Sequence, residues 1–203
     1  VTSPSPTEGN SVTAGNMAVV FAQAERKVLL VDADLRRPTV HKKLGLTKEP
    51  GLRELLFSED PFDAEVYSTI VDNLYVVPAG SAAPNPSELI GSKKMRDTIE
   101  LLRGTFDVLI FDAPPVLAAT DAVLLSTQCD ATLLVVAAGQ TKTFEVEYAM
   151  GALEGVGAQV IGTVFNGFDA SKTYGYSYRY RYGYVNYYGH SYAPSVRAGV
   201  QAS

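Results

Sequence analysis

Residues 28–38, which read Val28-Leu-Leu-Val-Asp32-Ala-Asp34-Leu-Arg-Arg37-Pro38, decide how this chain folds. An uninterrupted apolar run followed at once by acids is typical of a strand buried on both faces of a parallel sheet. Open α/β folds bind their ligands at the edge formed by the carboxyl ends of such strands. Asp32 and Asp34 could hold a metal–water shell there and accept a hydroxyl proton. Acidic turns after strands are also common without a function, but Arg36 and Arg37 directly behind the acids make a merely solvated turn a poorer explanation.

Four further apolar runs, at 74–78, 108–112, 131–137 and 160–165, also predict buried strands. Helical patterns lie between the strands, at about 11–25, 86–103, 120–128 and 142–155. This alternation predicts an α/β fold, with a doubly wound, mostly parallel sheet and helices on both faces. We expect a partly helical excursion over 39–73, and one domain over 1–170. Its first strand is truncated, because only Val1 and Thr2 precede the first loop.

The overall composition is that of a globular protein. The chain has 203 residues, of which 46% are hydrophobic and 19% charged, and this excludes a collagen, a coiled coil and a mainly disordered chain. The single cysteine, Cys129, excludes an intrachain disulfide framework and fits a reducing compartment. No apolar run approaches the roughly 20 residues of a membrane helix.

Residues 171–203 differ from the rest of the chain and predict a disordered, low-complexity tail. They contain nine of the 12 tyrosines, together with four basic residues and no Asp or Glu. Residues 1–170 hold the other 13 basic residues and all 22 acidic ones, so the tail should be attracted to acidic protein surface. Interleaved Tyr and Arg can also stack on nucleic-acid bases. The acidic body argues against that use, and we expect no nucleic-acid partner.

The loop before the first helical pattern is a candidate anion site. Residues 3–12 read Ser-Pro-Ser-Pro-Thr-Glu-Gly-Asn-Ser-Val. A loop that enters a helix presents backbone N–H groups to anions, and Ser11 stands where a phosphate loop offers its hydroxyl to Mg²⁺. Taken alone, the segment is better explained as a Ser/Pro loop that caps a helix.

A third acid completes the pattern. Residues 108–115 read Val-Leu-Ile-Phe-Asp-Ala-Pro-Pro, so a buried strand delivers Asp112 to the same sheet edge. A carboxylate placed there serves Mg²⁺ directly or through water. One acid at a strand end has little meaning, but three sites on three separate strand–helix turns, in this order, are hard to explain by accident.

VLLVDADLRRP (28–38), NPSELI (85–90), VLIFDAPP (108–115) and the tyrosine-rich tail together resemble the bacterial tyrosine kinases of capsular and exopolysaccharide systems. The resemblance covers almost the whole chain, and the tail is its most specific part. It implies a kinase domain of the P-loop NTPase type. In that family the first loop is Walker A, VLLVDADL is Walker A′, and FDAPP belongs to Walker B.

The resemblance also implies roles for individual residues. The catalytic acids would be Asp32, Asp34 and Asp112, one of the A′ acids acting as a base toward a tyrosine hydroxyl. Mg²⁺ would be held by Ser11, Asp32 and Asp112. ATP would be bound by Thr7, Glu8, Gly9, Asn10, Ser11 and Val12, with Asn166 near the base. Autophosphorylation would fall on Tyr174, Tyr176, Tyr178, Tyr180, Tyr182, Tyr184, Tyr187, Tyr188 and Tyr192.

The first loop departs from the family, where it reads Gly-Glu-Gly-Lys-Ser-Thr. Here it reads Thr7-Glu-Gly-Asn10-Ser-Val12. Thr7 adds a Cβ where the backbone needs the freedom of glycine, and Val12 removes a hydroxyl. Asn10 removes the ammonium that should contact the β- and γ-phosphates. We therefore expect an autokinase impaired by Asn10, and as the alternative a kinase-like regulator or scaffold that is weakened or inactive.

The family further implies a setting. ATP and Mg²⁺ would be the cofactors, and a membrane-embedded polysaccharide co-polymerase would be the activator, either upstream on the same chain or as a separate protein. A homo-oligomeric ring would form in the full-length protein, with phosphorylation between its subunits. The domain would then be cytoplasmic, at the inner face of the plasma membrane.

Overall fold

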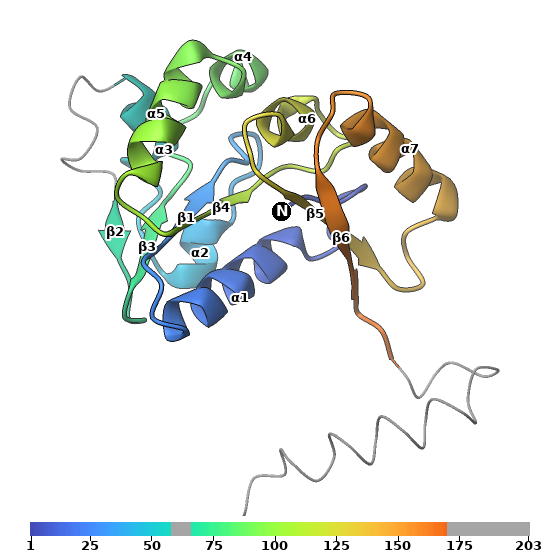
Figure 1. Ribbon diagram of the computed structural model, residues 1–203, viewed down its shortest axis with the longest axis horizontal. Helices are drawn as coiled ribbons and strands as arrows, with labels where there is room; N and C mark the ends of the chain where they lie inside the picture. Colours follow the sequence, from blue (N-terminus) through green and yellow to red (C-terminus); the bar gives the residue numbers. More distant parts are fainter. Residues whose placement is uncertain (58–65, 170–203) are drawn as a thin grey trace, which may run out of the picture. The chain divides into compact units, whose positions relative to one another are not determined.

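Strand β1 (Val28–Asp32) lies between two parallel neighbours, and all five of its residues are buried. It pairs with β3 (Leu74–Val77) on one side and with β4 (Val108–Asp112) on the other. The short strand β2 (Tyr67–Ser68) adds antiparallel to β3, which gives the order β2-β3-β1-β4. A second, parallel pair consists of β5 (Thr132–Ala137) and β6 (Val160–Asn166). The computed structural model describes residues 1–57 and 66–169 (Figure 1).

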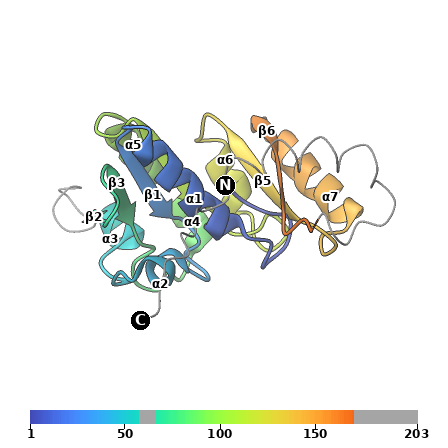
Figure 2. The same ribbon diagram turned by 90° about the horizontal axis from the view of Figure 1, so that it is seen from below.

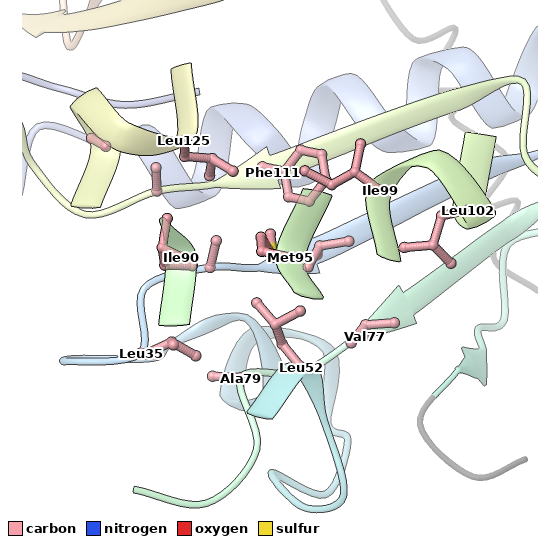
Figure 3. Packing of buried hydrophobic residues seen from close by; sticks show 14 of the residues in the cluster. Leu35, Leu52, Val77, Ala79, Ile90, Met95, Ile99, Leu102, Phe111 and Leu125 are labelled. Atoms are coloured by element: carbon pink, nitrogen blue, oxygen red, sulfur yellow. The ribbon is translucent and has the colours of Figure 1, made fainter. Parts of the chain in front are cut away.

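The helices cover both faces of the sheet, because the side chains of β1 alternate between two cores. Val28 and Leu30 pack with α1 (Asn10–Gln23) and α2 (Val40–Leu44) on one face. Leu29 and Val31 belong to the larger core on the other side. Figure 3 shows part of that core, with Met95 and Ile99 near its centre. That core is closed by α3 (Leu52–Phe57), α4 (Pro86–Ile90), α5 (Lys93–Arg103), α6 (Asp121–Ser126) and α7 (Thr143–Glu154) (Figure 2). The predicted doubly wound fold is confirmed.

One detail of the sequence prediction is wrong, and another was incomplete. The helix expected over 86–103 is two helices, because α4 ends at Gly91 and the Ser92 side chain caps a new helix by accepting from Met95 N. The excursion over 39–73 contains α2 and α3 as expected. It also contains β2, a strand of two residues that is too short to be predicted from the sequence.

Within residues 1–57 and 66–169, no helix combines the length and apolar character needed to cross a bilayer.

Val1 and Thr2, which the sequence assigned to a truncated first strand, lie between β4 and β5. The Val1 amino group donates to Phe111 O at 2.8 Å, and Thr2 N donates to Leu133 O at 3.0 Å. Next to them is a cavity of about 330 Å³ that Leu109 and Leu133 help to line from the two strands. Successive residues of a strand direct their backbone N–H and C=O groups to opposite sides. The backbone groups of Leu109 and Phe111 in β4, and of Leu133 in β5, therefore face the space between the two strands.

An N-terminal extension of four alternating apolar residues should therefore pair with both strands and fill the cavity. We expect the free energy of unfolding to rise by about 1–3 kcal/mol, since the added side chains are buried. The backbone N–H groups of Phe111 and Leu133 should also exchange more slowly with deuterium. A Gly-Ser extension of equal length is the control, and equal stability of the two forms would contradict this account of the cavity.

Candidate functional site

Two carboxylates lie side by side at the sheet edge. In the parallel register of β1 and β4, Asp32 is the partner of Asp112, and both residues are 0% exposed. Buried carboxylates are costly unless hydrogen bonds or cations compensate them. Their surroundings therefore indicate what the site is built to receive.

Asp32 organises the turn that follows β1. Its Oδ2 accepts hydrogen bonds from Thr39 N at 3.2 Å and Val40 N at 3.0 Å, and its Oδ1 accepts from Asp34 N at 3.3 Å. Burial, reinforced by the negative charge of Asp112, raises the pKa of Asp32 to about 7. Asp32 thus holds the first residues of α2 against the sheet edge.

Asp112 has an unused oxygen. Its Oδ1 accepts a hydrogen bond from Asn10 Nδ2 at 3.1 Å, whereas Oδ2 has no hydrogen-bond partner among the described residues. Burial raises the pKa of Asp112 to about 6, opposed by the nearby Ser11 hydroxyl. A buried, unpartnered carboxylate oxygen beside a serine hydroxyl suits a water molecule bound to Mg²⁺.

In the described part of the chain, no three His, Cys, Asp or Glu side chains group closely enough to hold a metal by themselves. Mg²⁺ needs only one or two carboxylates, because water and substrate phosphates complete its shell. The residues fit Mg²⁺ bound together with a nucleotide.

Asn10 occupies the position of the missing lysine and is almost completely buried. Its Nδ2 donates to Asp112 Oδ1 and also to Ala113 O, at 2.9 Å. An amide nitrogen has two hydrogens, so both are committed to the end of β4. Asn10 holds the loop against β4 and brings no positive charge to it.

Glu8 and Asn166 fix the same loop from the other side. Glu8 is 1% exposed, and its carboxylate accepts hydrogen bonds from Ser5 N and from Thr141 Oγ1. Asn166 Nδ2 donates to Glu8 O at 2.9 Å. Gly9 has a φ of 97°, and a Cβ there would collide with Asn166 Nδ2, so the glycine is required. In this structure Asn166 positions the loop with its amide nitrogen.

Thr7 adopts a φ of 67°, a conformation that L side chains rarely adopt. The sequence predicted that glycine freedom is needed here, and the backbone agrees. The Thr7 hydroxyl donates to Pro6 O and accepts from Gln140 Nε2 at 3.1 Å. These bonds offset part of the strain, which for a non-glycine residue costs on the order of 1–3 kcal/mol.

A pocket of about 670 Å³ opens at the first turn of α1. Four of the predicted residues are not among those that line it, namely Glu8, Asp32, Asp112 and Asn166. The first three are buried. Of the predicted site residues, those that line it are Thr7, Gly9, Asn10, Ser11, Val12 and Asp34. Sequence reasoning did not assign the other polar lining residues, which are Arg36, Arg37, Thr39 and Lys43. The predicted tyrosines lie outside the described residues.

The Arg36 side chain is bonded to residues of α4 and α6. Its guanidinium donates to both carboxylate oxygens of Asp121, at 2.8 and 3.1 Å, and to Ser87 Oγ at 2.9 Å. Asp121 is buried at the start of α6, and Ser87 lies on α4. In the sequence, the adjacent Arg36 and Arg37 marked this turn as unusual. No neighbouring residue indicated that Arg36 pairs with Asp121, which lies 85 residues away.

Known proteins resemble this chain in sequence and in fold. Residues 8–154 match a family model described as an AAA domain. The tyrosine-protein kinase YwqD of Bacillus subtilis is 40% identical over 178 residues, which cover 87% of this chain and 75% of YwqD. The kinase domain of the Escherichia coli tyrosine kinase ETK superposes with a TM-score of 0.81 at 33% identity, covering 87% of this chain and 69% of that one.

The match to other relatives is partial. The chain covers 24% of the tyrosine-protein kinase ptk of Acinetobacter johnsonii, at 36% identity over 85% of this chain. The septum site-determining protein MinD of Pyrococcus horikoshii, in complex with Mg-ADP, is 22% identical with a TM-score of 0.69, and covers 84% of this chain and 70% of that one. At this identity the likeness concerns the fold alone.

The raised pKa values of Asp32 and Asp112 predict how stability depends on pH. The folded chain binds these protons more tightly than the unfolded chain, so their contribution is complete below pH 4. It is lost as the pH rises through 6 and 7, by an amount on the order of a few kcal/mol. Urea denaturation of the ligand-free protein between pH 4 and 8 measures it. The difference between the wild type and Asp32→Asn isolates this term from other titrations, and parallel profiles of the two proteins would contradict it.

Proposed function

Since the chain belongs to the family of bacterial tyrosine-protein kinases, we propose that it is an ATP-dependent autokinase that phosphorylates its own tyrosine-rich segment. The observation that carries this proposal is the pocket that joins the first turn of α1 to Asp34. A phosphate chain bound at that turn would share the pocket with the Asp34 carboxylate, which does not belong to the buried pair of Asp32 and Asp112.

The phosphates would bind at the amino end of α1. The 14-residue helix begins at Asn10, and its first backbone N–H groups favour anions. Ser11 and the unpartnered oxygen of Asp112 would hold Mg²⁺, which when bound neutralises charge on the phosphates. Asp32, buried behind the pocket wall, would support this position and keep α2 in place.

Asp34 is the proposed base. It lines the pocket, and its Oδ1 accepts hydrogen bonds from Arg36 N at 3.1 Å and Arg37 N at 2.9 Å, so its orientation is fixed. In the transfer the tyrosine oxygen forms a bond to the γ-phosphorus, and the bond from that phosphorus to the leaving oxygen of ADP breaks. The phenol proton passes to the Asp34 carboxylate.

The family suggests the biological setting of this activity. We propose regulation of capsular or exopolysaccharide polymerisation and export, with phosphorylation between subunits of a ring in the full-length protein. The activator would be a membrane-embedded co-polymerase, on the same chain or separate, and the kinase domain would work in the cytoplasm at the inner face of the plasma membrane. These features concern the whole protein, and several relatives have chains far longer than this one.

Asn10 favours a second candidate function. Because its amide is fully bonded to the end of β4, the loop keeps its structure without the lysine. A chain with this loop could serve as a regulator or scaffold for an active relative of the same polysaccharide system. Binding of Mg-ATP without turnover would favour this candidate.

The proposed autokinase predicts phosphotyrosine within residues 171–203 after the full-length protein and its activator are incubated with Mg-ATP. Asp34→Asn should abolish it while ATP still binds, because the amide oxygen can accept the same two backbone hydrogen bonds but no proton. Asp72→Asn, at an exposed acid far along the chain, is the control. Mass spectrometry measures the sites, and a tail without phosphate in the wild type would overturn the proposal.

Restoring the lysine tests the account of the loop. Asn10→Lys should tighten Mg-ATP binding by roughly tenfold or more, since a charge-assisted hydrogen bond contributes about 1.5–3 kcal/mol. Turnover should rise by about 10²–10³, the usual effect of one preorganised charge at the transition state. Asn10→Met supplies a long side chain without charge and should give neither gain. If the lysine variant behaves like the methionine variant, position 10 does not limit activity.

A further inference from the structure

Lys43 is the feature of the pocket that the proposed function leaves unexplained. We infer that Lys43 supplies to the nucleotide phosphates the positive charge that Asn10 does not. This inference rests on the proposed binding of ATP and extends it, because it assigns the phosphate-binding cation to α2 rather than to the loop. Lys43 lines the same pocket as Asn10 and Ser11.

The side chain of Lys43 is directed toward the first turn of α1 by a chain of hydrogen bonds. Lys43 Nζ donates to Thr39 Oγ1 at 2.9 Å, and Thr39 Oγ1 donates to Ser11 Oγ at 3.2 Å. Two hydroxyl groups thus connect the ammonium to the serine proposed to bind Mg²⁺. A cation held at this place lies on the side of the pocket where the phosphates are proposed to bind.

The backbone under Lys43 is firmly held. Asp32 accepts hydrogen bonds from the backbone of Thr39 and Val40, and the Val40 side chain is buried in the core beside α1. Lys43 N then donates to Thr39 O within the helical turn. The ammonium is therefore presented from a fixed turn, although the side chain itself is exposed.

The charge of Lys43 already acts on the site. It is among the groups that lower the pKa of Asp112 against the effect of burial, so its field reaches the carboxylates behind the pocket wall. The other pocket cations are less suited. Arg36 is paired with Asp121. Arg37 donates its backbone N–H to Asp34, and in the described part of the chain no hydrogen bond directs its guanidinium toward Ser11.

The decisive measurement is the dissociation constant of the chain for Mg-ATP by titration calorimetry. Lys43→Gln should weaken binding roughly tenfold, the effect of losing a charge-assisted contact. Lys43→Arg should restore most of the affinity. Lys42→Gln is the matched control, because it removes the same charge from the neighbouring position, which is exposed and does not line the pocket. It should change the affinity less than twofold, and none of these variants should change AMP binding or the melting temperature.

A second background makes the test specific. In Asn10→Lys the phosphates gain another cation, so Lys43→Gln should cost much less affinity there than in the wild type. Equal effects of Lys43→Gln and Lys42→Gln would overturn the inference, as would a loss caused by Arg37→Gln instead, and both results would leave the proposed function standing. If the wild type binds no Mg-ATP, the proposed function and this inference fall together.

Discussion

The site depends on the register between β1 and β4, which places Asp32 directly beside Asp112 with both carboxylates buried. Two like charges at this distance oppose each other, and burial penalises both. Hydrogen bonds relieve only part of the cost, because Asp32 has three backbone donors whereas Asp112 has one amide donor and an unpartnered oxygen. The negative charge of the two carboxylates is therefore only partly compensated at the sheet edge. A divalent ion bound as proposed would compensate both carboxylates directly.

A side chain at position 10 can hold the loop in place and can bring positive charge to the pocket, and Asn10 can do only the first. Asn10 performs the structural task, since its amide joins the loop to Asp112 and Ala113. The electrostatic task is left to other groups. Glu8 and Asn166 hold the loop from the opposite side through contacts that need no cation, so the loop keeps its geometry without a lysine. That the loop keeps its shape therefore does not decide whether the chain is active.

The sequence predicted the fold well because its information is local. Apolar runs of five residues with an acid at the end, such as 28–32 and 108–112, specify both a buried strand and the edge at which it stops. The break of the expected helix at Gly91 and Ser92 was also local, but Gly and Ser are tolerated inside helices often enough that neither forces an end. The anchoring of the loop was not predictable in this way. Asn10 reaches a strand 102 residues away, and Arg36 an aspartate 85 residues away, so these partners follow from the packing of separate elements.

The same reasoning explains why Lys43 is invisible in the sequence. Lysines are common in short helices at the protein surface. The neighbouring Lys42 does not line the pocket, whereas Lys43 does. What distinguishes Lys43 is the position of α2, and Asp32 sets that position by binding the backbone at the start of the helix. One of the two buried carboxylates is therefore also the group that brings a cation toward the pocket. Arg36 completes the frame, because its pair with Asp121 holds the other end of the loop that carries Asp34. With the loop fixed at both ends, a change of charge at position 43 alters the field in the pocket and leaves its walls in place.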